Sequence, residues 1–120
     1  MLTNFDELKS LASAEMNKSY PAGEKKCGVT LLSKSGKIYL GHRVCFADGH
    51  LLDAVDMAVY SALADGCTKF LAAAICGNDA PSKSALSRLA SFSDMMVSLG
   101  IGAVSADTSL KKLLLQLGEK

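Results

Sequence analysis

The spacing of hydrophobic positions changes several times along the chain, and each change marks the boundary of a predicted element. Apolar residues recur at helical spacing in four segments, and short, almost continuous apolar runs lie between these segments. The predicted helices begin at Thr3 or Asn4, at Leu51, at Ser82 or Ser84, and at Ser109, and the predicted strands cover residues 27–33, 37–44, 69–76, 95–99 and, as a short fifth strand, 103–105. This order predicts an α/β fold in which helices cover both faces of a mixed sheet of four or five strands.

The segment from Leu51 to Cys76 carries a change from helical to strand-like spacing. Its first part predicts a largely buried helix, and Gly66 lies where a helix commonly stops. The run Lys69–Cys76 that follows is short, almost entirely apolar and flanked by Gly66 and Gly77. Such a run is typical of a parallel strand that is covered on both faces.

Composition and charge narrow the class of protein. The 120 residues, 49% of them hydrophobic, suit one compact domain over residues 1–120. The net charge is +1 and the lysines are scattered, so we expect no binding to nucleic acid. No apolar run approaches the roughly 18 residues of a membrane span. The N-terminus lacks the features of a secretion signal, and we therefore expect a cytoplasmic protein without a membrane partner.

The four cysteines are Cys27, Cys45, Cys67 and Cys76, and none of them forms a C-x-x-C pair. Their spacing predicts neither a structural zinc site nor a redox motif, so we interpret them as small hydrophobic residues. A thiol nucleophile formed by Cys45 with His42 is not expected, because residues three apart in a strand point to opposite faces.

The order of elements and several short motifs together resemble one enzyme family. The motifs are S-Y-P (19–21), C-G-V-T-L-L (27–32), S-G-K-I-Y-L-G (35–41), the helix-and-strand segment 54–70 and S-L-K-K-L-L-L (109–115). In this order and spacing they resemble the small homotetrameric cytidine deaminases over nearly the whole chain. The resemblance implies a three-layer α-β-α sandwich and a homo-oligomer, either a dimer or a tetramer.

The residues on which the chemistry of that family depends are replaced in this sequence. In the family, a zinc ion is held by Cys or His at one helix N-terminus and by the two cysteines of P-C-x-x-C at another. The zinc activates water, and a Glu two residues after the first ligand transfers protons. Here Asp53 stands at the first ligand position and Val55 at the Glu position, while Ser82 and Ala85 stand at the two thiolate positions. The comparison of motifs therefore predicts a degenerate pocket with no catalytic residue and no zinc.

The sugar-binding residues of the family are also replaced, because Cys45 and Phe46 stand at the Glu and Asn positions of its V-E-N motif. Our leading hypothesis is a non-catalytic oligomeric protein with a structural, regulatory or small-molecule-binding role. In the ligand-binding form of this hypothesis, Phe46 stacks on a base. The alternative is a divergent nucleoside or nucleotide deaminase, a hydrolase in which His50 and Asp53 bind a metal and Asp56 replaces the missing Glu. A third protein ligand for such a metal is hard to identify in the sequence.

Asp53 has a second predicted role, at the junction of two helices. Without zinc, the positive N-termini of the two helices would face each other with no anion between them. The carboxylate of Asp53 can take that place by accepting hydrogen bonds from the backbone of residues 82–84 or by pairing with Lys83. On this hypothesis Asp53→Ala lowers the melting temperature by a few degrees, as expected for a loss of about 1 kcal/mol.

Overall fold

The computed structural model describes residues 5–20, 26–78, 81–92, 95–101 and 104–118. The helices in these residues are α1 (Phe5–Met16), α2 (Ala54–Ala64), α3 (Lys83–Ala90) and α4 (Leu110–Gly118). The strands are β1 (Cys27–Ser33), β2 (Ile38–His42), β3 (Val44–Cys45), β4 (Leu51–Leu52), β5 (Phe70–Gly77), β6 (Met96–Ile101) and β7 (Val104–Ser109). None of the helices in this part of the chain is long and apolar enough to cross a membrane.

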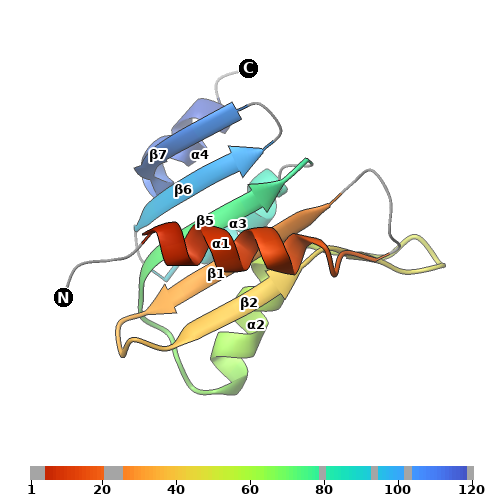
Figure 1. Ribbon diagram of the computed structural model, residues 1–120, viewed down its shortest axis with the longest axis horizontal. Coiled ribbons are helices and arrows are strands. Elements are labelled where there is room, and N and C mark those ends of the chain that lie inside the picture. The colour runs from red at the N-terminus through yellow and green to blue at the C-terminus, as the bar shows by residue number, and fades with distance from the viewer. Residues whose placement is uncertain (1–4, 21–25, 79–80, 93–94, 102–103, 119–120) are drawn as a thin grey trace.

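The main sheet has five strands in the order β2-β1-β5-β6-β7. Only the β5–β6 pair is parallel among the described strands, whereas β1 pairs antiparallel with both β2 and β5, and β6 pairs antiparallel with β7. Helix α1 lies across one face of this sheet, and α2 and α3 lie behind the other face (Figure 1). The predicted α/β sandwich with a mixed sheet is therefore confirmed.

The central strand β5 is covered on both faces, as the apolar run predicted. Ala72 and Ala74 pack with Leu8 and Ala12 of α1 on one side. Ala73, whose side chain points to the other face of the strand, belongs to the larger core that contains residues of α2 and α3. Because successive side chains of a strand point to opposite faces, the small residues of β5 allow helices to approach the sheet on both sides.

Two glycines bring helices against the backbone of the sheet. A Cβ atom at Gly28 of β1 would collide with the carbonyl oxygen of Ala12 in α1. A Cβ atom at Gly41 of β2 would collide with the carbonyl oxygen of Ala54 and would lie 2.6 Å from the backbone nitrogen of Ala58. The first turns of α2 are therefore fixed against β2 at a distance that only glycine permits.

The predicted start of the second helix at Leu51 is wrong. Leu51 and Leu52 form β4, which pairs with β3 in a small two-stranded sheet. The helix begins at Ala54, because Asp53 adopts an extended conformation (φ −71°, ψ 145°) and caps it. Two adjacent leucines fit the spacing of a helix and of a strand equally well, so periodicity could not place this boundary.

The other predicted boundaries agree with the structure to within a few residues, with one longer strand. Strand β7 has six residues and pairs with β6 along its length, whereas the sequence predicted a short strand at 103–105. Gly66 follows the end of α2 with φ +79°, which confirms the predicted stop. The predicted caps Thr3 and Asn4 lie outside the described residues.

Candidate functional site

The N-termini of α2 and α3 meet at one carboxylate. Asp53 caps α2, and its Oδ1 atom accepts a hydrogen bond from the backbone N–H of Val55 at 3.0 Å. Its Oδ2 atom accepts a hydrogen bond from the backbone N–H of Ser82 at 2.9 Å. Ser82 in turn caps α3, because its Oγ atom accepts from the backbone N–H of Ala85 at 3.1 Å. One buried aspartate thus links the starts of two helices that lie about thirty residues apart in the sequence.

The electrostatics of the helix ends favour this arrangement. Both N-termini carry partial positive charge, and the carboxylate of Asp53 lies between them with only 9% of the residue exposed. The expected hydrogen bond from the backbone of residues 82–84 is therefore present. Lys83 is exposed, and no ion pair joins it to Asp53 among the described residues, so the alternative link through Lys83 is absent there.

Val55 and Ala85 lie behind this junction in the core. Both residues are fully buried and belong to the main hydrophobic cluster. Neither side chain has a group that can bind a metal or transfer a proton. The two positions therefore contribute packing to the site and no chemistry.

A small cavity of about 100 Å³ lies beside Asp53. It is lined by Cys27, Arg43, Leu51, Asp53, Ala54, Pro81 and Ser82. Of the residues expected in the degenerate pocket, Asp53 and Ser82 line it, whereas Cys45, Phe46 and Lys83 do not. Sequence reasoning did not place Cys27 or Arg43 at this site, because it could not place the start of β1 beside the end of β5, where Cys27 pairs with Gly77.

Asp56, the candidate replacement for a catalytic Glu, is engaged by an arginine. Its two carboxylate oxygens accept hydrogen bonds from Nε of Arg88 at 2.9 Å and from Nη2 at 2.6 Å. Asp56 is 7% exposed, whereas the Arg88 side chain is half exposed. The bidentate pair joins α2 to α3 a second time, in addition to the link through Asp53. Nothing in the sequence pattern indicated it, since the partners are 32 residues apart.

His50 is exposed and lies directly before β4, after the turn that follows β3. The backbone N–H of His50 donates to Oδ1 of Asp48 at 3.0 Å, and its ring lies 5.7 Å from the ring of Phe46. Because His50 precedes β4 and is not part of α2, the helical spacing that would have placed it on one face with Asp53 does not occur. The geometric basis of the alternative metal site is therefore wrong.

His42, the other histidine, contacts a glutamate of α1. Its Nδ1 atom lies 2.7 Å from Oε2 of Glu15, and Lys18 forms an ion pair with the same carboxylate at 3.1 Å. Burial alone would raise the pKa of Glu15, but the hydrogen bonds from His42 and Lys18 outweigh it, so the pKa lies below its ordinary value. The pair connects α1 to β2 and leaves His42 bonded to Glu15.

Several solved structures have the same fold. A cytidine deaminase from Burkholderia pseudomallei is 26% identical, and the alignment covers 92% of this chain and 96% of that chain with a TM-score of 0.81. A cytidine deaminase from Mycobacterium leprae is 21% identical over 94% of this chain and 98% of that chain, with a TM-score of 0.76. The cytidine deaminase from Mycobacterium tuberculosis is 16% identical over 93% of this chain and 94% of that chain, with a TM-score of 0.75. Comparisons with protein-family models and with curated proteins give no match.

The chain is cytidine deaminase-like. The resemblance in short motifs and the similarity in fold lead to the same family, and the alignments extend over nearly the whole chain. In this cytidine deaminase-like fold, α2 and α3 are the helices whose N-termini carry the replaced motifs, D-A-V and P-S-K-S-A.

The donors at the family's zinc positions do not fit zinc in this cytidine deaminase-like chain. Both oxygens of Asp53 already accept hydrogen bonds from backbone N–H groups, and Oγ of Ser82 accepts one as well. Ala85 has no donor atom. Structural and catalytic zinc sites take at least three Cys, His, Asp or Glu ligands from the protein. No group of three such residues is close enough to hold a metal in the part of the chain that the structure describes.

Proposed function

We propose that this chain is a non-catalytic cytidine deaminase-like protein in which a carboxylate link replaces the zinc of the family. The observation that carries this proposal is the position of Asp53, whose two oxygens accept hydrogen bonds from the starts of α2 and α3. A metal at Asp53 would have only the hydroxyl of Ser82 and the side chain of Ala85 at the other two family positions, fewer than the three protein ligands that zinc sites use. The junction of the two helices is thereby closed by protein groups alone.

The position of the family's proton-transferring Glu supports the same proposal. Val55 stands there, and its side chain is fully buried in the core. Asp56, one residue later, uses both oxygens to bind Arg88. Hydrolytic deamination needs a group that moves protons between water and the base. Neither residue supplies one.

The small size of the cavity beside Asp53 supports the non-catalytic proposal. Its volume is about 100 Å³. Pockets that enclose small organic molecules commonly have volumes of about 300–1,000 Å³. A whole nucleoside therefore exceeds the space that one chain offers at this position.

We propose further that the protein forms a homo-oligomer, a dimer or a tetramer. Large apolar side chains are exposed on two helices that cover the same side of the sheet: Tyr60 at 54% and Leu63 at 41% on α2, and Leu115 at 62% on α4. Exposed apolar groups of this kind are common where subunits associate. Light scattering coupled to size-exclusion chromatography at micromolar concentration tests this proposal, and a monomer would overturn it.

The metal content of the purified protein tests the main proposal. The untagged protein is expressed with added zinc, is never exposed to chelator, and is measured by inductively coupled plasma mass spectrometry together with an assay for cytidine turnover. We expect zinc well below one atom per chain and no turnover. Near-stoichiometric zinc, or turnover of cytidine, would overturn the proposal and support the divergent deaminase instead.

A further inference from the structure

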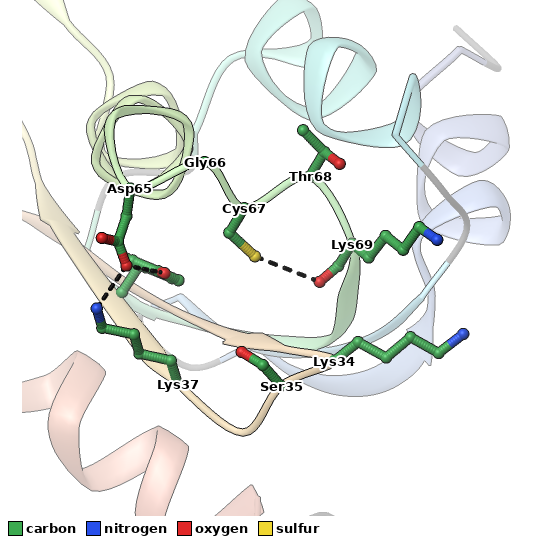
Figure 2. Close-up of a pocket in the computed structure, with 9 residues that line it drawn as sticks. Lys34, Ser35, Lys37, Asp65, Gly66, Cys67, Thr68 and Lys69 are labelled. Atoms are coloured by element: carbon green, nitrogen blue, oxygen red, sulfur yellow. Dashed lines mark hydrogen bonds and ion pairs between the residues drawn. The ribbon is translucent and has the colours of Figure 1, made fainter.

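A larger cavity, of about 460 Å³, opens at the opposite end of the sheet from Asp53. It lies between the turn that joins β1 to β2 and the loop that joins α2 to β5 (Figure 2). The Asp53 cavity adjoins the end of β5, whereas Lys69 of this second cavity directly precedes the first residue of β5. Among the described residues the two cavities share no lining residue, so they are separate sites.

The carboxylate of Asp65 lines this cavity and is bound by the side chains of Lys37 and Tyr39. The ammonium group of Lys37 forms an ion pair with Oδ2 of Asp65, and the hydroxyl of Tyr39 donates to the same oxygen at 2.7 Å. The hydrogen bonds from Lys37 and Tyr39 lower the pKa of Asp65. The hydrogen bond to Asp65 is the main cause that raises the pKa of Tyr39 to about 12, so the hydroxyl keeps its proton near neutral pH.

The negative C-terminus of α2 also points toward this region, but its carbonyl groups have partners. The backbone N–H groups of Asp65 and Cys67 donate to the carbonyl oxygen of Ala62, and the N–H of Gly66 donates to that of Leu63. Because these oxygens are satisfied within the loop, the helix end presents few free acceptors to the cavity.

Two further lysines give the cavity a positive wall. The backbone N–H of Lys34 donates to the carbonyl oxygen of Lys69 at 2.9 Å, which holds the two residues side by side although they are 35 positions apart. In Figure 2 both side chains extend to the same side, whereas Lys37 turns the other way toward Asp65. No ion pair to either Lys34 or Lys69 occurs in the described residues. With three ammonium groups and one carboxylate, the lining has a net charge of +2.

We propose that this cavity binds a small phosphate monoester, with its phosphate between Lys34 and Lys69 and its organic part against Cys67 and Thr68. The dianion of a phosphate monoester has the charge that balances the two unpaired lysines. The volume exceeds that of the phosphate alone and lies within the range of pockets for small organic molecules, about 300–1,000 Å³. The backbone hydrogen bond between Lys34 and Lys69 fixes the two residues side by side, so their side chains start from neighbouring positions on one wall.

Titration of the whole protein with phenyl phosphate, inorganic phosphate and phenol tests this assignment. Binding is followed at low salt by NMR of backbone amides, because exposed charges are screened at high ionic strength. We expect phenyl phosphate to shift the amide signals of Lys34, Thr68 and Lys69 and to bind more tightly than inorganic phosphate. Phenol should cause no comparable shift at these amides. Equal shifts with phenol, or none with either phosphate, would overturn the proposal.

Two double variants distinguish binding of phenyl phosphate at this cavity from a general attraction of the anion to positive charge. Lys34→Gln with Lys69→Gln removes the positive wall, and Lys111→Gln with Lys112→Gln removes the same charge from α4. All four lysines are exposed, so both variants should fold, and circular dichroism checks that they do. We expect the first variant to weaken binding of phenyl phosphate about tenfold or more, and the second to change it less than about twofold. Equal weakening in both would overturn the proposal.

Discussion

Replacing Asp53 with alanine removes two hydrogen bonds that hold different helices. The carboxylate accepts from Val55 N–H at 3.0 Å within α2 and from Ser82 N–H at 2.9 Å at the start of α3. Loss of a helix cap costs about 1 kcal/mol, and a partly buried N–H without its acceptor costs about 1 kcal/mol more. The free energy of unfolding should fall by about 2 kcal/mol, which lowers the melting temperature of a chain of this size by about 8 °C.

Asp53→Asn distinguishes the link between helices from capping alone. Asparagine caps helices as well as aspartate does. Its amide, however, offers one acceptor oxygen in place of two, so either Val55 or Ser82 loses its acceptor. We therefore expect Asp53→Asn to lose about 1 kcal/mol. If this variant is as stable as the unmodified protein, the two-acceptor link is refuted.

Urea unfolding followed by circular dichroism measures both variants, and Asp48→Ala is their matched control. Asp48 also accepts a backbone hydrogen bond, from His50 at 3.0 Å, but it is exposed in the turn between β3 and β4. We expect the control to change the free energy of unfolding by less than about 0.5 kcal/mol. Similar losses for Asp53→Ala and Asp48→Ala would contradict the reasoning, because they would show that burial between two helices adds nothing.

Three further substitutions test contacts that fix the helices around the site. Gly41→Ala should lower the free energy of unfolding by about 3 kcal/mol or more, because its Cβ collides with the backbone of α2. The control Gly100→Ala, whose Cβ would lie 3.9 Å from the carbonyl oxygen of Ile75, should change stability by less than about 1 kcal/mol in the same urea experiment. Arg88→Gln leaves the buried carboxylate of Asp56 without its bidentate partner and should cost about 1–2 kcal/mol; an unchanged urea midpoint would contradict this. The stability advantage of the unmodified protein over Glu15→Gln should be complete near pH 7 and should shrink as the pH falls below about 4, because the pKa of Glu15 is lower in the folded than in the unfolded state. Urea unfolding between pH 7 and pH 3 measures this difference in the free energy of unfolding. A difference that stays constant over this pH range would contradict the prediction.

The elements of the fold were predictable where the sequence pattern is unambiguous. The largely apolar run 27–33, which ends at the turn residues K-S-G, matches β1 to the residue, and Gly66 ends α2 as predicted. Leu51 and Leu52 were assigned to the wrong element, since pairing with β3 is a tertiary contact that local spacing does not encode. The spacing of hydrophobic residues thus located the core elements but not the short strands β3 and β4, which lie outside the main sheet.

The candidate site was predictable in part, and that part depended on the resemblance to a family. The link from Asp53 to the start of α3 followed from two helix N-termini that the resemblance brought together. The pair of Asp56 with Arg88 and the contact of Glu15 with His42 each join residues more than 25 positions apart. Such contacts depend on the packing of whole elements, which periodicity does not specify.

The charges at the two ends of β5 are distributed differently, and this bears on where a ligand can bind. At the starts of α2 and α3, Asp53 and Asp56 each have both oxygens in hydrogen bonds: Asp53 caps α2 and reaches the start of α3, and Asp56 binds Arg88 of α3. A ligand that draws either carboxylate out of these hydrogen bonds loses about 1 kcal/mol for each bond broken. At the other end, Asp65 has its own partners, and an anion that binds Lys34 and Lys69 breaks no ion pair in the described residues. Ligand binding at the lysine end is therefore compatible with an intact link at Asp53, and substitutions at either end should leave the other function unchanged.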